Sequence, residues 1–569
     1  MAAETRSPWT PGTIGWLALL ACFFGAFLVY PVGHLLREAF LVDGKFTLGT
    51  FAQLVTNPVL VRSIGNSLLL ATLTTALTTA LSLPLAYGLT RFSFRGQSLL
   101  NALLLVPMIM PPFVGAIGLR QLFARFGSVN LLLMKLGWVD ASHPIDWLGE
   151  GGFAGMLILQ VFSLYPVMLL NLSAALANID PALREAAQNL GGGPVRVFRT
   201  ILAPLILPGW FAGAIIVFIG SFTDLGTPLI FGFSQVVPVQ IYDSITDLNT
   251  NPMGYALVVF VMVFTLGLFV ISKRLVNRRS HAMLARGHTA GASVPATPRQ
   301  AFLLWLGAGT VVLLGVLPHL AVILQSFASR WFFGILPDSL TLAHYAELGT
   351  QKAVAGSIRN SLLYSSLSAT LDLVLGVGIA WLLTRRRIPF AGVIDALAML
   401  PLALPGIVIA FGYVAAFDSR IPWLNPRENP MLLLVIGYAV RRLPYIVRSA
   451  CAGFQQTSVT LEEASASLGA SPFTTLRRIT LPLIAANLIA GTILTFSLAM
   501  LEVSDGLILA MKEPFFPITK MIWLLMGRIE PDAASVASAL GVVGMAILAV
   551  SLFMASRLLG RNLGQLFRS

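Results

Sequence analysis

The sequence predicts an all-α integral membrane protein with about 12 transmembrane helices, arranged as two tandem six-helix repeats. Three observations lead to this fold class. The chain is 56% hydrophobic and only 11% charged, it contains a series of long apolar runs, and its second half repeats landmarks of its first. A soluble domain carries about 25% charged residues on average. With so few charges, most of the exterior must face lipid rather than water.

The apolar runs define the individual spans. A helix needs about 20 apolar residues to cross the hydrocarbon core of a bilayer. In the first half, runs of this kind lie near residues 14–36, 66–90, 99–123, 154–178, 204–230 and 254–275. In the second half, they lie near residues 301–327, 360–384, 394–417, 431–454, 482–511 and 536–558.

A change of composition separates the sixth run from the seventh. Residues 273–300 are basic at first and then rich in Gly, Ala, Ser, Pro and Thr. This composition is typical of a flexible linker. The chain therefore divides into a first half at 1–272, a linker at 273–300 and a second half at 301–569.

The two halves share landmark residues in the same order. Pro111 is followed 294 residues later by Pro405, and Pro166 is followed 278 residues later by Pro444. The offset decreases from 294 to 278 between the first pair and the second. The first half therefore carries the longer loop, around residues 124–152. Each half has an even number of spans, so both halves have the same orientation. Their pseudo-two-fold axis then runs along the membrane normal.

The distribution of Lys and Arg orients the chain. They are more numerous on the side that holds the linker, both termini and the loops after spans 2, 4, 8 and 10. The dense clusters at 273–279 and 385–387 lie on this side, which is therefore cytoplasmic. The net charge of +13 reflects this bias, and no nucleic-acid partner is expected.

Two cytoplasmic loops repeat a capped helix. The loop after span 4 reads IDPALREAAQNLGGGPVRVFRTILAP (179–204), and the loop after span 10 reads TSVTLEEASASLGASPFTTLRRITLP (457–482). Asp180 and Ser458 are expected N-caps. Gly191 and Gly469 are expected to end the helices, because the residue after a C-cap usually takes the left-handed conformation.

These loops resemble the EAA motif of binding-protein-dependent ABC importer permeases. The first copy departs from the pattern with Ala203 in place of Leu, and the second with Ser465 in place of the second Ala. The resemblance implies the type I importer fold and a contact between each loop and a separate ATPase. The residues expected to couple to that ATPase are Glu185, Ala186, Ala187, Gly191, Glu463, Ala464, Ser465 and Gly469.

The segments FTDLGTPLIFG (222–232) and EVSDGLILAMKEPFFPITKMIW (502–523) look like the fifth-span segments of fused permeases for ferric iron. Permeases for thiamine, polyamines, phosphonates and phosphorylated sugars share much of the pattern, so these substrates remain alternatives. The family implies two copies of a nucleotide-binding subunit, which bind ATP and Mg, and a periplasmic binding protein. It also implies a location in the bacterial inner membrane.

Ionisable residues inside spans are costly and therefore mark candidate pathway sites. Arg441 and Arg442 lie about 15 Å into span 10, and Asp372 lies about 18 Å into span 8, at 1.5 Å per residue. Both spans enter from outside, so these depths allow an inert Arg–Asp pair. The alternative is an arginine that faces the pathway and attracts an anion.

The fifth span of each half carries an acid at an equivalent position. Asp224 and Glu502 are separated by the 278-residue offset, and each lies about 30 Å along its span, near the outer mouth. Asp505 lies one turn further on. A ring of carboxylates there would favour cations, whereas acids hydrated by bulk water would have no such role.

Two other classes of protein compete with this interpretation. A secondary transporter with a six-plus-six repeat explains the spans and the duplication, but not the two EAA-like loops. A membrane-bound enzyme is disfavoured because no nucleophile or metal-ligand motif occurs, and no bound cofactor or metal site is expected. The chain also contains no G-x-x-x-x-G-K-[ST] string, so we expect ATP hydrolysis to belong to a partner.

Overall fold

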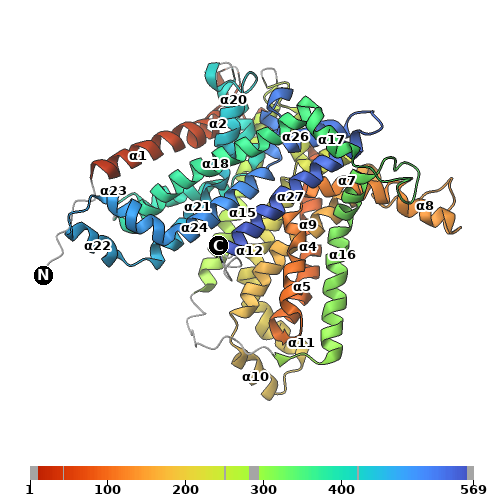
Figure 1. The fold of residues 1–569 in the computed structure, drawn as a ribbon, viewed down its shortest axis with the longest axis horizontal. Helices are drawn as coiled ribbons and strands as arrows, with labels where there is room; N and C mark the ends of the chain where they lie inside the picture. Colours follow the sequence, from red (N-terminus) through yellow and green to blue (C-terminus); the bar gives the residue numbers. More distant parts are fainter. Residues whose placement is uncertain are drawn as a thin grey trace.

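The computed structural model describes residues 10–42, 44–248, 251–280, 294–386, 388–418 and 422–559. These residues are mostly helical (Figure 1). Two small sheets pair β1 (Leu41–Val42) antiparallel with β2 (Lys45–Phe46), and β3 (Phe92–Ser93) parallel with β4 (Val294–Pro295).

The helices fall into two comparable series. Those of the first half are α1 (Pro11–Phe24), α2 (Tyr30–Phe40), α3 (Gly49–Thr56), α4 (Pro58–Arg91), α5 (Gln97–Leu104), α6 (Val106–Ile109), α7 (Pro112–Phe123), α8 (Ser128–Lys135), α9 (Phe153–Ala177), α10 (Pro181–Asn189), α11 (Pro194–Val197), α12 (Ala203–Phe222), α13 (Gly226–Phe231), α14 (Val237–Asp243) and α15 (Met253–Ser280). Those of the second half are α16 (Pro298–Phe327), α17 (Ala343–Thr350), α18 (Lys352–Arg385), α19 (Ala391–Met399), α20 (Gly406–Phe417), α21 (Met431–Gln456), α22 (Val459–Ser467), α23 (Pro472–Thr475), α24 (Leu481–Met500), α25 (Ser504–Leu509), α26 (Ile518–Met526) and α27 (Ala533–Leu559). Short 3₁₀ or π-helical turns lie at Gly25–Val29, Glu150–Gly152, Phe198–Leu202, Leu400–Leu402, Pro422–Leu424, Leu476–Thr480 and Glu513–Phe515.

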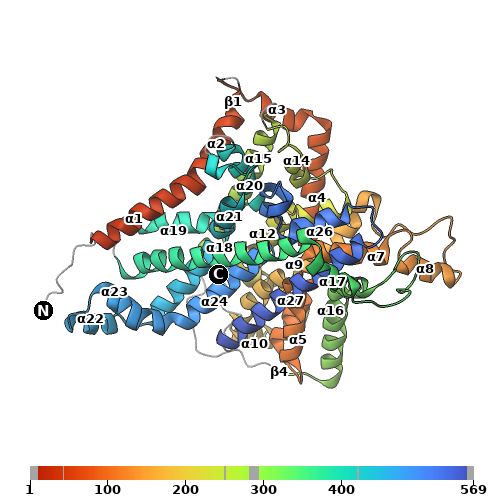
Figure 2. The same ribbon diagram turned by 45° about the horizontal axis from the view of Figure 1, so that its top comes forward.

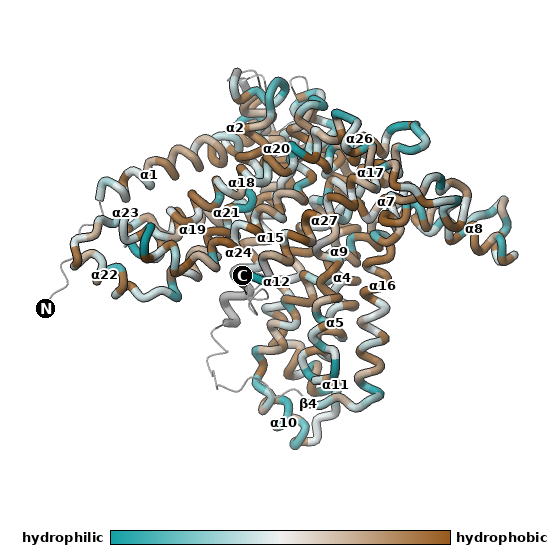
Figure 3. Tube along the Cα trace, in the orientation of Figure 1, coloured by the Kyte–Doolittle hydropathy of each residue, from teal (hydrophilic) through white to brown (hydrophobic). Residues whose placement is uncertain are grey.

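The predicted all-α membrane fold is confirmed, with a different count of spans. Within the described residues, nine helices are long and apolar enough to cross a membrane, or eleven if each of two bent pairs is one span. The remaining predicted span, 431–454, corresponds to α21, whose three arginines make it more charged than an ordinary span. Apolar residues dominate the long helices, and hydrophilic residues gather on the loops and on α10 (Figure 3).

Two predicted spans are not continuous helices. The segment predicted at 99–123 bends by 90° between Met108 and Pro112, and the segment predicted at 394–417 bends by 101° between Leu402 and Gly406. Proline lacks an N–H group and disfavours helical geometry in the residue before it. The paired prolines that revealed the repeat therefore also break the third span of each half.

The fifth spans end earlier than predicted. The runs predicted at 204–230 and 482–511 correspond to α12 and α24, which end at Phe222 and Met500. Short helices α13 and α25 follow each break. In the first half, Asp224 Oδ1 accepts hydrogen bonds from the backbone N–H groups of Gly226 and Thr227. This carboxylate thus caps a new helix instead of lying inside a continuous one.

The first long helix of each half packs against the other half. Helix α16 of the second half packs on α7 and α5 of the first, and α2 of the first half packs on α20 of the second. Away from this shared region the molecule divides into two arms (Figures 1 and 2). Helix α10 lies at the end of one arm and α22 at the end of the other.

The ends of the predicted linker have regular structure. Helix α15 continues to Ser280, and β4 pairs with β3 after α4. Thr297 and Gln300 then form a capping box that begins α16. Regular structure therefore occupies both ends of 273–300, residues 281–293 lie outside the described residues, and the flexible linker stays a prediction.

Candidate functional site

Helices α10 and α22 begin where the sequence predicts. The Asp180 carboxylate accepts a hydrogen bond from the Ala182 N–H at 2.9 Å, and the Ser458 hydroxyl accepts one from the Thr460 N–H at 3.3 Å. Pro181 occupies the first turn of α10, where its missing N–H costs nothing. Local capping therefore sets the start of both helices.

Both helices end at a left-handed glycine. Gly191 has a φ of 80° and Gly469 a φ of 82°. The N–H of Gly191 donates to the carbonyl of Gln188, and the N–H of the next residue donates to the carbonyl of Ala187, each at 2.9 Å. The second copy makes the equivalent bonds. This pair of hydrogen bonds is the Schellman motif, which needs a left-handed residue at the position of the glycine.

The two loops expose the same three apolar positions. Each pair is separated by the 278-residue offset, and the pairs are Leu183 and Leu461, Leu190 and Leu468, and Val195 and Phe473. Leu190 and Leu468 are each 89% exposed, directly before the terminal glycines. Glu185, Ala186, Glu463 and Ala464 are also exposed. Both loops thus expose matched apolar side chains, a pattern typical of surfaces that contact another protein.

The departure of Ser465 from the EAA pattern has a compensating partner. Ser465 is buried, and its hydroxyl lies 2.8 Å from that of Thr475, which is also buried. At the offset of 278, the first half has Ala187 and Val197 at these positions. The first half thus has two apolar side chains where the second half makes a hydroxyl–hydroxyl hydrogen bond.

Only α22 is tied to a span by an ion pair that the structure records. Arg385, at the end of α18, donates to Glu462 at 3.0 Å and to the carbonyls of Phe454 and Thr457 at 2.9 Å each. The residue equivalent to Glu462 in α10 is Arg184. We call the Arg385–Glu462 contact the latch, and the first half replaces its acid with a base.

A buried ion-pair cluster lies in the second half. Glu502 forms ion pairs with both Arg441 and Arg442 of α21, accepts a hydrogen bond from Arg442, and has an almost fully buried side chain. The pairing that depth suggested, between an arginine and Asp372, is therefore wrong. Distance along a helix equals depth only for a helix perpendicular to the membrane, and the break after α24 redirects the chain. The arginines neutralise Glu502 and stabilise its burial.

Two further acids lie buried in the same half. Within the part of the chain that the structure describes, neither oxygen of Asp372 or Asp505 has a hydrogen-bond partner. Both side chains are 0% exposed. An ionised carboxylate in such a place is costly unless it is paired. Asp372 and Asp505 are thus the unpaired acids of this cluster. The first half has neutral residues at the positions equivalent to these acids.

The first half stabilises its equivalent acid with neutral groups. The side-chain amide of Gln160 donates to Asp224 at 3.1 Å. Gln160 in turn accepts from the hydroxyls of Ser221 and Thr74. Glu502 is thus paired with two arginines and Asp224 with an amide, and a role for these acids in passing a cation stays a prediction.

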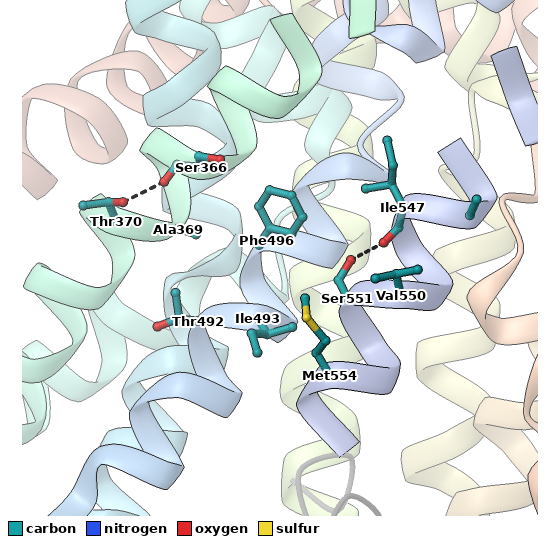
Figure 4. A pocket seen from close by; sticks show the side chains of 11 residues that line it. Ser366, Ala369, Thr370, Thr492, Ile493, Phe496, Ile547, Val550, Ser551 and Met554 are labelled. Atoms are coloured by element: carbon teal, nitrogen blue, oxygen red, sulfur yellow. Dashed lines mark hydrogen bonds between the residues drawn. The ribbon is translucent and has the colours of Figure 1, made fainter. Parts of the chain in front are cut away.

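A cavity of about 650 Å³ lies elsewhere, between α18, α24 and α27. Its lining is mainly apolar, with Phe496 and Met554 among the contributing side chains (Figure 4). The hydroxyls of Thr370 and Ser551 on its wall donate to backbone carbonyls of their own helices. Neither hydroxyl offers its hydrogen to a solute, so this cavity does not carry the polar features of a substrate site.

Comparison with known proteins agrees with this geometry. The family described as "Binding-protein-dependent transport system inner membrane component" matches residues 78–281 and again residues 373–565. Each match begins within the second span of one half and covers the EAA-like loop and the later spans of that half. The chain belongs to this family, and it is the membrane component of an ABC importer with both halves fused.

Three relatives align over most of the chain. The putative ferric transport system permease protein FbpB 1 of Haemophilus influenzae is 29% identical over 85% of this chain and 76% of its own length. The ferric transport system permease protein FbpB of Actinobacillus pleuropneumoniae is 28% identical over 93% of this chain and 76% of its own. The probable ABC transporter permease protein y4fN of Sinorhizobium fredii is 26% identical over 96% and 97%.

Proposed function

We propose that this permease moves ferric iron from a periplasmic binding protein to the cytoplasm, powered by two copies of an ATPase subunit. The matched apolar surface on the two loops supports the contact with the ATPase, and the ferric permeases among the relatives support the substrate. Leu190 and Leu468 project at equivalent places on two capped helices. One chain thus offers two similar surfaces, which suits two identical ATPase subunits. ATP and Mg belong to these subunits, and both termini of the permease face them in the cytoplasm.

The contact with each ATPase subunit comprises a short helix and its terminal leucine. Glu185 and Glu463 supply a charge on the exposed faces of α10 and α22. The small side chains of Ala186 and Ala464 allow another protein to approach these faces closely. A short amphipathic helix with apolar anchors is suited to a groove on another protein. The glycine caps fix the direction in which each anchor projects.

A co-purification experiment tests this contact. Leu190→Glu and Leu468→Glu should each reduce recovery of the ATPase with the permease, because a charge replaces an apolar anchor. Leu136→Glu, on an exposed leucine after α8, is the matched control and should leave recovery unchanged. Equal recovery with all three variants would contradict the assignment of these loops.

Native mass spectrometry and reconstitution test the remaining parts. The complex should contain one copy of this chain and two of the ATPase. Liposomes that hold the permease alone should not accumulate substrate under a proton or sodium gradient, as a secondary transporter would. The substrate follows from the ligand that the cognate binding protein retains on purification, for which ferric iron is the expected result.

A further inference from the structure

Two repeat-equivalent residues touch each other across the halves. Ser67 and Ser361 are equivalent in the two halves, and each accepts a hydrogen bond from the N–H group that begins α14 or α26, at Val237 and Ile518. The offset between these two helices is therefore 281, which makes Tyr242 equivalent to Trp523, and the ring centroids of these two residues lie 6.1 Å apart. The Lys520 ammonium lies beside this contact and donates to the Tyr242 hydroxyl at 3.0 Å. A pseudo-two-fold rotation carries the positions of Tyr242 and Trp523 onto each other. Two such positions can be in contact only near the axis, so this contact marks where the axis passes.

The ammonium at this point is enclosed by neutral groups. Lys520 is 7% exposed, and its Nζ also donates to the carbonyl of Leu507 at 2.8 Å. It lies 4.7 Å from the ring centroid of Trp523, 5.4 Å from that of Tyr242 and 5.7 Å from that of Phe516. Aromatic faces stabilise a cation without neutralising it. A net positive charge therefore remains on the axis.

The contact lies away from the coupling loops. Helix α14 packs on α20, which in turn packs on α2, and these elements lie opposite α10 and α22 (Figures 1 and 2). A solute that follows the axis from the binding-protein side must separate Lys520 from Tyr242 before it passes between the halves.

We propose that the Lys520–Tyr242 contact closes the pathway on the axis, and that the Lys520 charge makes this closure a barrier to small cations. The inference rests on the proposed function, because it treats the axis as the route of the solute. A positive charge at a constriction excludes cations electrostatically. The fusion of the halves permits this arrangement. Two identical subunits would place a second lysine at the position of Val239, whereas this chain has a single ammonium there, with a phenol as its partner.

Ion leakage through the closed complex tests the proposal. The permease with its ATPase is reconstituted in liposomes without ATP or binding protein, and potassium and chloride fluxes are measured. Lys520→Gln should raise potassium flux by roughly tenfold or more. A like charge a few ångströms away raises the energy of a potassium ion enough to lower its occupancy of the constriction by at least about this factor. Chloride flux should stay at the wild-type level.

Three further variants separate charge from shape. Lys520→Arg keeps the charge and should remain tight to potassium. Tyr242→Phe keeps both the ring and the ammonium and should also remain tight. Lys512→Gln removes an exposed lysine six residues beyond the buried Gly506 and is the matched control. A tight Lys520→Gln complex, or equal leakage of potassium and chloride, would overturn the charge barrier. These measurements need neither substrate nor ATP, so failure of the proposed function would show separately, in the uptake and co-purification experiments.

Discussion

The two halves solve the same structural problem with different chemistry. Each places an acid at the break after its fifth span, at Asp224 and Glu502. The first half surrounds its acid with amide and hydroxyl groups centred on Gln160, whereas the second uses Arg441 and Arg442. Duplication thus preserved the backbone break and the acid while the partners diverged. The break, rather than an open carboxylate, is the feature that both halves share.

The loops differ in the same way. The Arg385–Glu462 latch joins α22 to the end of α18, and Arg184 takes the place of the acid in α10. Yet the terminal glycines and the exposed leucines are the same in both loops. The surface offered to a partner is therefore conserved between the halves, while the attachment of each loop to its own half is not.

The largest expected effect tests the difference between the surroundings of Glu502 and Asp224. Glu502→Gln leaves two buried arginines without a counter-charge and should destabilise the protein by about 3–5 kcal/mol. Asp224→Asn is the matched variant and should cost only about 1 kcal/mol, since an amide can still accept from Gln160. Thermal unfolding of the purified proteins measures both. Equal losses in the two variants would mean that the halves do not differ as described. The double variant should also slow uptake, with the affinity of the binding protein for its ligand unchanged.

The next effect sharpens the similarity of the loops. Gly191→Val and Gly469→Val place a β-branched residue at a φ near 80°, at a cost of about 1–2 kcal/mol or more. The helix ends should fray, so ATPase recovery and uptake should both fall while membrane levels stay normal. Gly193→Val is the control, because Gly193 has a φ of −66° and open space around its Cα. A loss of recovery with Gly193→Val alone would refute the role of the caps.

A smaller effect concerns the latch. Glu462→Gln removes the partner of Arg385 and should weaken the link between α22 and α18 by about 1 kcal/mol, because the pair is only partly buried. Uptake should fall moderately, and the ratio of ATP hydrolysed to solute moved should rise. Glu428→Gln, at an exposed glutamate outside both loops, leaves the latch intact and should preserve that ratio. An unchanged ratio in Glu462→Gln would show that the latch does not transmit force.

The last comparison, in which a double variant should be nearly neutral, tests the exchange of packing at Ser465. Thr475→Val alone leaves a buried hydroxyl without its partner and should cost about 1–3 kcal/mol. The double change Ser465→Ala with Thr475→Val recreates the apolar pair of the first half and should be nearly neutral. Thermal unfolding of the single and double variants decides this. Additive losses would show that the two hydroxyls act independently.

Several features of function were missed by reading the sequence alone, although a usable signal was present. Applying the 278-residue offset residue by residue pairs Leu190 with Leu468, whereas the axial pair of Lys520 and Tyr242 comes together only in the structure. Neither residue of the axial pair belongs to a motif, and neither leucine is distinctive by itself. Their meaning depends on contact and exposure, which an alignment of the halves does not contain.

The sequence by itself determined the membrane class, the duplication and the capped loops. Hydropathy, proline and glycine positions and N-caps such as Asp180 act over one helical turn or one span, so they can be read along the chain. Its prediction of continuous third and fifth spans failed where prolines or a capping carboxylate redirected the backbone.

Only the tertiary structure decided which charges meet. The sequence gives the distance of Arg441 along its helix, but not the direction in which the side chain points or the tilt of the helix. Pairing with Glu502 rather than Asp372 depends on all three. The contact between Lys520 and Tyr242 likewise arises only when the two halves assemble around their axis. Electrostatic partners separated by long stretches of chain are set by packing, because no local pattern records the rotation of one helix against another.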